Sequence, residues 1–206
     1  MEPLLQKSFL HLHECFTVNQ YVDLLWKQNK LIKARQKNGE FWQLQGDPLT
    51  DSIGLVYADT VGRILEKELS LTYTMLRRWK KDCFMDWHRN RWECEYTVVI
   101  QISDSNWPIG FADRDDTLSG SNPLILGERT KEHNKIITPL QGDAIIFNGA
   151  ETHHGRRPLK ENACTTLMLY YVEKDAFLDT MDSRKLYGDN YKTKIRPHGN
   201  VWEIDA

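Results

Sequence analysis

The stretch that decides the fold reads DWHRNRWECE, from Asp86 to Glu95, and it leads directly into an apolar segment, Tyr96 to Ile102. Within this stretch a histidine precedes a short polar side chain by two positions, in the order His88-Arg-Asn90. The segment that follows is rich in valine and isoleucine, which are enriched in β-strands. The block therefore predicts a histidine and a neighbouring polar group held just ahead of a strand.

A second block further along the chain also joins an apolar run to a histidine. It reads GDAIIF at residues 142–147 and is followed by HHGR at residues 153–156. A mononuclear non-haem iron centre takes three protein ligands on one side of the metal, usually two histidines and one carboxylate, and keeps its other positions open. The two blocks supply the histidines for such a metal site, whereas Asn90 stands where the carboxylate is expected.

The composition is that of a single globular domain, residues 1–206. Hydrophobic residues make up 40% of the chain and charged residues 27%, and the net charge of −2 gives no basic surface for nucleic acid. No apolar run is long enough to span a bilayer, and the first residues lack the pattern of a signal peptide. We expect a cytoplasmic protein that binds neither nucleic acid nor membrane. The four cysteines form no C-x-x-C pair, which favours buried free thiols over disulfides.

The helical part is expected first, at about residues 1–69. The segment Thr17–Gln20 has the form of a capping box and predicts a helix over about residues 18–35. Asp51 is expected to cap a second helix that ends near Leu69. The apolar stripe of this second helix would consist of Leu55, Val56, Ile64 and Leu65. Both helices are predicted to pack on one side of a sheet.

From Ser70 the pattern changes to short β-rich runs separated by turn residues. The predicted strands are Leu71–Arg77, Tyr96–Ile102, Ala144–Phe147 and Thr165–Val172. Several short strands at this spacing predict a double-sheet jelly roll. The expected fold class is therefore α+β and mainly β, a double-stranded β-helix with N-terminal supporting helices. Its barrel would occupy about residues 70–173, followed by an irregular C-terminal tail at 174–206.

A long polar segment, Ser103 to Lys135, interrupts the strands. We expect it to contain short strands around Trp107–Phe111 and Pro123–Leu126, with Asp113–Asn122 as an exposed loop at the mouth of the barrel. The alternative is a solvated surface insertion without a role at the site.

Several blocks occur in a fixed order across about residues 50–173. They are LTYT (71–74), RRW (77–79), His88-x-Asn90-Arg91-x-x-Cys94-Glu95-Tyr96, WPI (107–109), GDAIIF (142–147) and His154-x-Arg156. Together they resemble the iron(II)- and 2-oxoglutarate-dependent oxygenases, in a branch similar to the small prolyl-hydroxylase-like proteins of bacteria and phages. The resemblance implies a dioxygenase with iron(II) and 2-oxoglutarate as cofactors, a small-molecule or peptide substrate, and His88 and His154 as iron ligands. In that family the first block carries Asp where this chain has Asn90.

The far carboxylate of 2-oxoglutarate needs a cation, and a bidentate arginine is its strongest partner. Arg156 follows His154 by two residues, and on a strand this parity turns both side chains to the same face. Arg156 is therefore the first candidate for this contact, and Arg157 is the second. Tyr73, on a strand expected to line the barrel, is predicted to donate a hydrogen bond to the same carboxylate.

The neutral side chain of Asn90 leaves four interpretations open. In the first, Asn90 is itself a weak ligand, directly or through water. In the second, a neighbouring acid, Asp86 or Glu93, takes its place. In the third, the site is degenerate and the chain is a jelly-roll binding protein. In the fourth, loss of the carboxylate frees a metal position for halide and the enzyme is a halogenase.

The remaining candidates concern the substrate and other partners. His153 competes with His154 for the ligand role, and is otherwise expected to contact substrate. Trp92 is expected to belong to a substrate wall. The basic run Arg77, Arg78, Lys80 and Lys81 is interpreted as a solvated strand end, with recognition of an acidic substrate group as the alternative. A second copy of the chain, in a homodimer, is the other partner considered.

Overall fold

A computed structural model of the chain describes residues 1–36, 39–112 and 135–174. Three predictions fall outside these residues, namely the strand at Pro123–Leu126, the exposed loop at Asp113–Asn122 and the course of the tail after residue 174.

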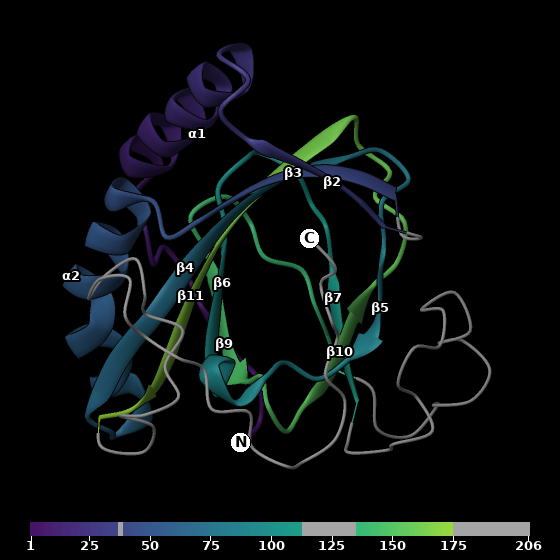
Figure 1. The fold of residues 1–206 in the computed structure, drawn as a ribbon. Helices are drawn as coiled ribbons and strands as arrows, with labels where there is room; N and C mark the ends of the chain where they lie inside the picture. Colours follow the sequence, from purple (N-terminus) through teal and green to yellow (C-terminus); the bar gives the residue numbers. More distant parts are fainter. Residues whose placement is uncertain (37–38, 113–134, 175–206) are drawn as a thin grey trace.

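The described residues form two helices, one turn of 3₁₀ helix and eleven strands (Figure 1). The helices are α1 (Leu12–Lys27) and α2 (Pro48–Leu65), and the 3₁₀ turn is η1 (Trp92–Cys94). The strands are β1 (Leu4–Gln6), β2 (Ile32–Gln36), β3 (Gly39–Gln45), β4 (Leu69–Lys80), β5 (Met85–His88), β6 (Tyr96–Gln101), β7 (Ile109–Ala112), β8 (Lys135–Ile137), β9 (Ala144–Asn148), β10 (His153–Arg156) and β11 (Ala163–Glu173).

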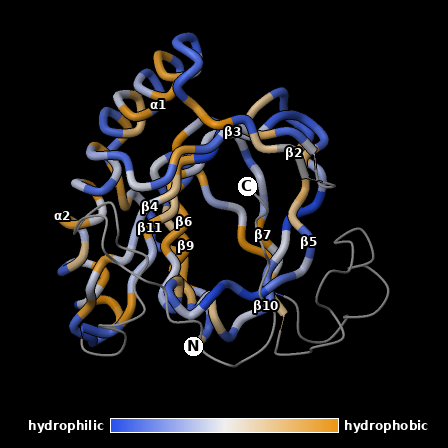
Figure 2. The backbone as a smooth tube through the Cα atoms, in the orientation of Figure 1, coloured by the Kyte–Doolittle hydropathy of each residue, from blue (hydrophilic) through white to orange (hydrophobic). Residues whose placement is uncertain are grey.

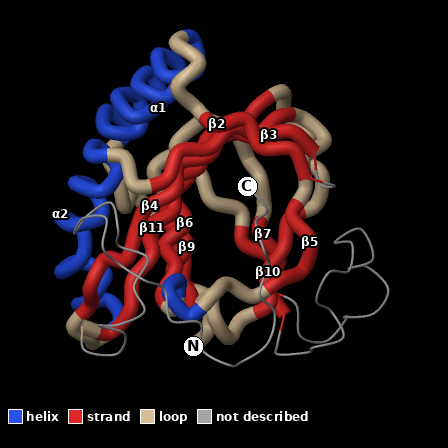
Figure 3. Tube along the Cα trace, viewed as in Figure 1, coloured by secondary structure: helices blue, strands red, loops and turns tan. Residues whose placement is uncertain are grey.

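The strands pair into two sheets that face each other (Figures 1 and 3). The major sheet has the order β1-β9-β6-β11-β4-β3-β2, and the minor sheet has the order β5-β10-β7-β8. Neighbouring strands run antiparallel in both sheets. This arrangement confirms the predicted double-stranded β-helix. The N-terminal part differs from the expectation in one respect, because β1, β2 and β3 also join the major sheet.

Helix α1 begins earlier than predicted, because its cap lies at His11. The backbone N–H of His11 donates to Oε2 of Glu14 at 2.7 Å, which satisfies a group that the helix would otherwise leave unpaired. Thr17, predicted to precede the helix, lies inside it, and its hydroxyl donates to the carbonyl oxygen of His13 at 2.9 Å. The helix ends at Lys27, and residues 32–36, which were predicted to be helical, form β2.

Helix α2 begins at Pro48, because Asp47 rather than Asp51 caps it. The backbone N–H of Leu49 donates to Oδ1 of Asp47 at 3.0 Å, and a proline in the first turn suits this position because no donor is needed there. Asp51 is instead buried in the first turn, where it accepts a hydrogen bond from the hydroxyl of Thr74 on β4 at 2.6 Å. The carboxylate thus ties the helix to the major sheet.

The predicted apolar stripe of α2 is wrong in its first half. Leu55 and Val56 are 53% and 74% exposed. Gly54 faces the sheet instead, so closely that a Cβ atom there would lie 2.8 Å from the methyl carbons of Leu71. The hydroxyl of Tyr171 on β11 donates to the carbonyl oxygen of Gly54 at 2.7 Å. A residue without a side chain therefore allows the close contact between helix and strand.

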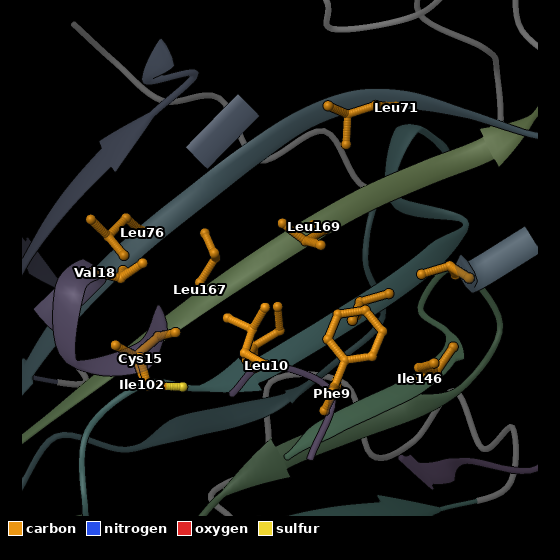
Figure 4. Packing of buried hydrophobic residues seen from close by; sticks show 14 of the residues in the cluster. Phe9, Leu10, Cys15, Val18, Leu71, Leu76, Ile102, Ile146, Leu167 and Leu169 are labelled. Atoms are coloured by element: carbon orange, nitrogen blue, oxygen red, sulfur yellow. The ribbon is translucent and has the colours of Figure 1, made fainter. Parts of the chain in front are cut away.

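Apolar packing joins the helices to one face of the major sheet, as predicted. The buried cluster there includes Phe9, Leu10, Cys15, Val18, Leu71, Leu76, Ile102, Ile146, Leu167 and Leu169 (Figure 4). Among the strands of this sheet, β6 and β9 are visibly apolar along much of their length (Figure 2). Because side chains alternate along a strand, the opposite face of the sheet points into the barrel, where Tyr73, Met75, Met168 and Tyr170 belong to a second cluster.

The four cysteines are buried and free, in agreement with the composition. Within the described ranges, neither helix has the length and apolar character required to cross a membrane.

Candidate metal centre

The two predicted histidine ligands lie side by side in the minor sheet. His88 is the last residue of β5, and its cross-strand partner on β10 is His154. The centroids of the two imidazole rings are 4.3 Å apart, and the ring planes meet at 51°. The fold therefore brings together two side chains that are far apart in the sequence, close enough for one metal ion to contact both rings.

Backbone carbonyl groups fix the tautomer of both rings. Nδ1 of His88 lies 2.8 Å from the carbonyl oxygen of Asp86, and Nδ1 of His154 lies 2.9 Å from that of Thr152. A carbonyl oxygen only accepts, so each Nδ1 carries the proton and each Nε2 keeps its lone pair. Metal-binding histidines are oriented in this way by a partner of the other ring nitrogen.

Burial keeps both rings neutral. It lowers the pKa of His88, and it lowers that of His154 well below the usual value, with the charge of the neighbouring His88 as the next cause. His154 is 4% exposed and its ring contacts Phe147, with ring centroids 4.7 Å apart in an edge-on arrangement. Two neutral imidazoles in a dry apolar setting are suited to hold a divalent metal ion.

Asn90 is held by both its backbone and its side chain. Its backbone N–H donates to the carbonyl oxygen of Gly149 at 2.7 Å, and Nδ2 donates to Oγ1 of Thr97 at 2.9 Å. A Cβ atom at Gly149 would lie 2.6 Å from Nδ2 of Asn90, so only glycine leaves room for this contact. Because the amide nitrogen is taken by Thr97, Oδ1 is the atom left to bind a metal.

The interpretation in which Asp86 or Glu93 replaces the missing carboxylate gains no support from the residues that the structure describes. Among them, no group of three His, Cys, Asp and Glu side chains is placed to hold a metal ion. Asp86 contacts His88 through its backbone carbonyl, and its carboxylate is not a third ligand beside the histidines. Within the described residues, the candidate donors for a metal are therefore the two imidazoles and the amide oxygen of Asn90.

Arg156 is buried inside the barrel, at 2% exposure. Its Nη1 donates to the carbonyl oxygen of Trp107 at 2.8 Å, and its Cζ lies 4.4 Å from the centre of the Trp107 indole. Burial lowers its pKa to about 10, so the guanidinium remains charged at neutral pH. No carboxylate of the described residues pairs with it, and a buried charge of this kind is stabilised by an anion.

The other two cosubstrate candidates lie in different surroundings. The side chain of Arg157 is exposed, and its carbonyl oxygen accepts a hydrogen bond from Nε1 of Trp107 at 2.7 Å. The hydroxyl of Tyr73 lies 3.0 Å from Sγ of Cys94 and accepts a hydrogen bond from Nη2 of Arg91 at 3.2 Å. Of the three, only Arg156 combines a buried guanidinium with donors that no acceptor of the described residues uses.

The two substrate candidates differ in exposure. His153 is fully buried beside His154, whereas Trp92, in the 3₁₀ turn that follows the first histidine, is 37% exposed. Trp92 is therefore accessible to a ligand, and His153 is enclosed by protein.

The prediction that the basic run is exposed to solvent is wrong for Arg77. The basic run was interpreted as solvated, and Arg78 does pair with Asp23 of α1 while Lys80 pairs with Glu40 of β3. Arg77, however, is half-buried, and its guanidinium lies 5.1 Å from the ring centre of Phe41 and 5.2 Å from that of Trp79. The parity that it shares with Tyr73 along the strand was the available signal.

No family model and no curated protein sequence matches the chain. Solved structures do match it. The non-haem α-ketoglutarate-dependent epimerase SnoN from nogalamycin biosynthesis has a TM-score of 0.68 at 12% identity, covering 96% of this chain and 91% of that one. A prolyl-4-hydroxylase from Pseudomonas putida has a TM-score of 0.61 at 12% identity, with coverages of 84% and 92%.

HygX from Streptomyces hygroscopicus, solved with nickel, 2-oxoglutarate and hygromycin B bound, also has a TM-score of 0.61 at 12% identity, with coverages of 84% and 83%. These likenesses, together with the two facing sheets, show that the chain has the double-stranded β-helix fold of these solved structures.

Proposed function

We propose that the chain is a non-haem iron(II)- and 2-oxoglutarate-dependent oxygenase that hydroxylates a small molecule or a peptide. In this proposal His88 and His154 bind the metal through Nε2, and Oδ1 of Asn90 takes the third position. Arg156 binds the far carboxylate of 2-oxoglutarate.

The observation that carries the proposal is the histidine pair. The imidazoles of His88, which is half-buried, and of His154, which is buried, lie at paired positions of two strands, and each gives Nδ1–H to a backbone carbonyl, which leaves Nε2 for a ligand. The similar structures support the same assignment, since SnoN is α-ketoglutarate-dependent and HygX was solved with nickel and 2-oxoglutarate.

Iron(II) at this place would supply open positions for the cosubstrate and for oxygen. Other residues of the chain orient the side chains that would bind the metal. The carbonyls of Asp86 and Thr152 orient the two imidazoles, and Thr97 orients the amide of Asn90. The phenyl ring of Phe147 limits the access of water to the His154 side of the pair.

Replacing Arg156 with methionine should raise the 2-oxoglutarate requirement roughly ten- to a hundredfold, because a charge-assisted contact contributes about 1.5–3 kcal/mol and each 1.4 kcal/mol is a factor of ten. The stability of the protein should change little, because the substitution removes a buried charge that no carboxylate of the described residues balances. Anaerobic titration of the iron-loaded protein with 2-oxoglutarate and a urea unfolding curve measure the two quantities separately.

The matched control is Arg157→Met, which removes a neighbouring arginine whose side chain is exposed. This control should leave the 2-oxoglutarate affinity unchanged. Equal affinity in Arg156→Met and the wild type would exclude Arg156 as the anchor.

One observation favours a second candidate, a non-catalytic jelly-roll protein that binds a 2-oxo acid. Among the described residues, no group of three His, Cys, Asp or Glu side chains is placed to hold a metal ion. Supplying iron(II), 2-oxoglutarate and oxygen and then measuring succinate distinguishes the two candidates. Succinate above the metal-free background supports the oxygenase, whereas 2-oxoglutarate binding without succinate formation supports the binding protein.

A further inference from the structure

We propose that Arg77 forms a second anion-binding site inside the barrel, separate from Arg156, and that the molecule oxidised there carries a carboxylate or a similar anionic group. The substrate part of this inference rests on the proposed function, in which Arg156 is assigned to the cosubstrate.

Strand alternation places Arg77 on the inner face of β4. Tyr73 and Met75 belong to the cluster inside the barrel, whereas Leu76 packs against the helices on the other face. Arg77 has the parity of Tyr73 and Met75. Its guanidinium lies over the rings of Phe41 and Trp79, which come from the two neighbouring strands β3 and β4. Two aromatic faces thus position the cation.

The donors of Arg77 are largely unused. A guanidinium has five N–H donors in a planar fork. Within residues 1–36, 39–112 and 135–174, only Nε–H has an acceptor, Oε1 of Gln43 at 3.3 Å, and no carboxylate pairs with Arg77. Nη1 and Nη2, the two groups that bind a carboxylate in a bidentate contact, have no acceptor among these described residues. A half-buried cation is stabilised by an anion.

Arg77 and Tyr170 lie on the neighbouring strands β4 and β11, and both belong to the face that lines the barrel. Burial raises the pKa of Tyr170, so its phenol stays protonated. An anion bound to Arg77 would hold the rest of its molecule in the interior of the barrel, with a neutral phenol as a further donor.

The guanidinium groups of Arg77 and Arg156 contact different aromatic rings. Arg77 stacks on Trp79, and Arg156 stacks on Trp107, at 5.2 and 4.4 Å from the respective ring centres. The two indoles contact each other edge-on, with centroids 5.2 Å apart. Arg156 is also fixed by the carbonyl of Trp107, whereas Arg77 is fixed by Gln43 on β3. The charge of neither arginine is among the causes that shift the pKa of the other, so we treat them as two separate anion-binding groups.

The test uses three acids with their neutral amides as probes, namely acetate, benzoate and 3-phenylpropionate. Each is titrated by calorimetry into the full-length protein loaded anaerobically with iron(II) and saturating 2-oxoglutarate. In the wild type, at least one acid should bind roughly tenfold or more tightly than its amide, the effect of one charge-assisted contact. Arg77→Met should remove this preference without weakening 2-oxoglutarate, and Arg77→Lys should keep part of it.

Arg156→Met provides the reciprocal control, because it should weaken 2-oxoglutarate and keep the preference for the acid. The proposal is overturned if no acid is preferred, if the preference survives Arg77→Met, or if Arg77→Met weakens 2-oxoglutarate as Arg156→Met is expected to do. If the wild type forms no complex with iron and 2-oxoglutarate, the same titrations are made on the metal-free protein. A preference that depends on Arg77 then supports the anion site while the oxygenase assignment fails.

Discussion

Changing His154 to alanine should abolish the retention of iron(II), and changing His88 to alanine should do the same. In the proposed site of two imidazoles and one amide, no ligand carries a negative charge, so the loss of one imidazole would leave too few donors to hold the metal. Even substitutions of residues that only support a ligand cost about 10–100-fold in metal affinity, so we expect the loss of a ligand itself to cost at least roughly a hundredfold. Anaerobic dialysis against iron(II), followed by a colorimetric iron assay, measures the effect.

His153→Ala is the matched control. His153 is as deeply buried as His154 and is its neighbour on β10, so both substitutions disturb the strand to a similar extent. The control should keep its iron, and circular dichroism of all three variants separates loss of metal from loss of fold. If His153→Ala loses iron while His154→Ala keeps it, the ligand is the neighbouring histidine and the assignment is off by one residue.

Asn90→Asp should tighten iron binding and at the same time destabilise the protein. A carboxylate adds the charged third ligand that iron(II) prefers. The hydroxyl of Thr97 already donates to the carbonyl oxygen of Cys94 at 2.9 Å, and it accepts from Nδ2 of Asn90. A carboxylate oxygen in place of Nδ2 has no proton to give, so Thr97 must either face a second acceptor or release Cys94. An unsatisfied buried polar group costs about 1–3 kcal/mol, which we expect as the loss of unfolding free energy.

A double-mutant cycle isolates this contact. Thr97→Val removes the acceptor at nearly constant volume, and the penalty of Asn90→Asp should be smaller in that background. Iron affinity, unfolding free energy and succinate formation are measured for all four proteins. Weaker iron binding in Asn90→Asp would contradict the placement of residue 90 beside the metal.

The direction in which Asn90→Asp changes succinate formation distinguishes an active enzyme from a protein with a degenerate site. Succinate formation that rises from near zero in Asn90→Asp means that the natural site is degenerate. A fall from an active wild type means that the neutral amide is part of a tuned site, and the hydrogen-bond chain from Asn90 through Thr97 to Cys94 supports that outcome. Chloride-dependent activity in the wild type that is absent in Asn90→Asp would favour the halogenase.

The fold was predictable from the sequence because the strands around the site are strongly apolar. The runs that became β6, β9 and β11 were identified with bounds close to those in the structure. The helix starts were less certain, because Thr17 and Asp51 resemble caps although the groups that act are Glu14 and Asp47. Caps depend on which backbone groups a fold leaves unpaired, and local sequence does not reveal this.

Within the site, the position of the two histidines followed from their order along the chain and from strand parity. The partners of Asn90 did not, because Thr97 and Gly149 become its neighbours only through the pairing of β6 with β9. Arg77 was interpreted together with its basic neighbours as a solvated strand end, with recognition of an acidic substrate group as the alternative. Only the alternation of the strand separates it from Arg78, which pairs with Asp23 of α1. Whether a charged side chain is buried depends on how the strands pair and pack, so the composition of the basic run predicted the wrong exposure for Arg77.

Anaerobic titration of the wild-type protein with iron(II) and then with 2-oxoglutarate tests the central claim most directly. The account predicts one iron per chain and, once 2-oxoglutarate is added, a weak visible charge-transfer band that saturates with the cosubstrate. The band should be absent in His88→Ala and in His154→Ala, and it should need more 2-oxoglutarate in Arg156→Met. A wild-type protein that retains no iron and develops no band would contradict the account and leave the binding protein in its place.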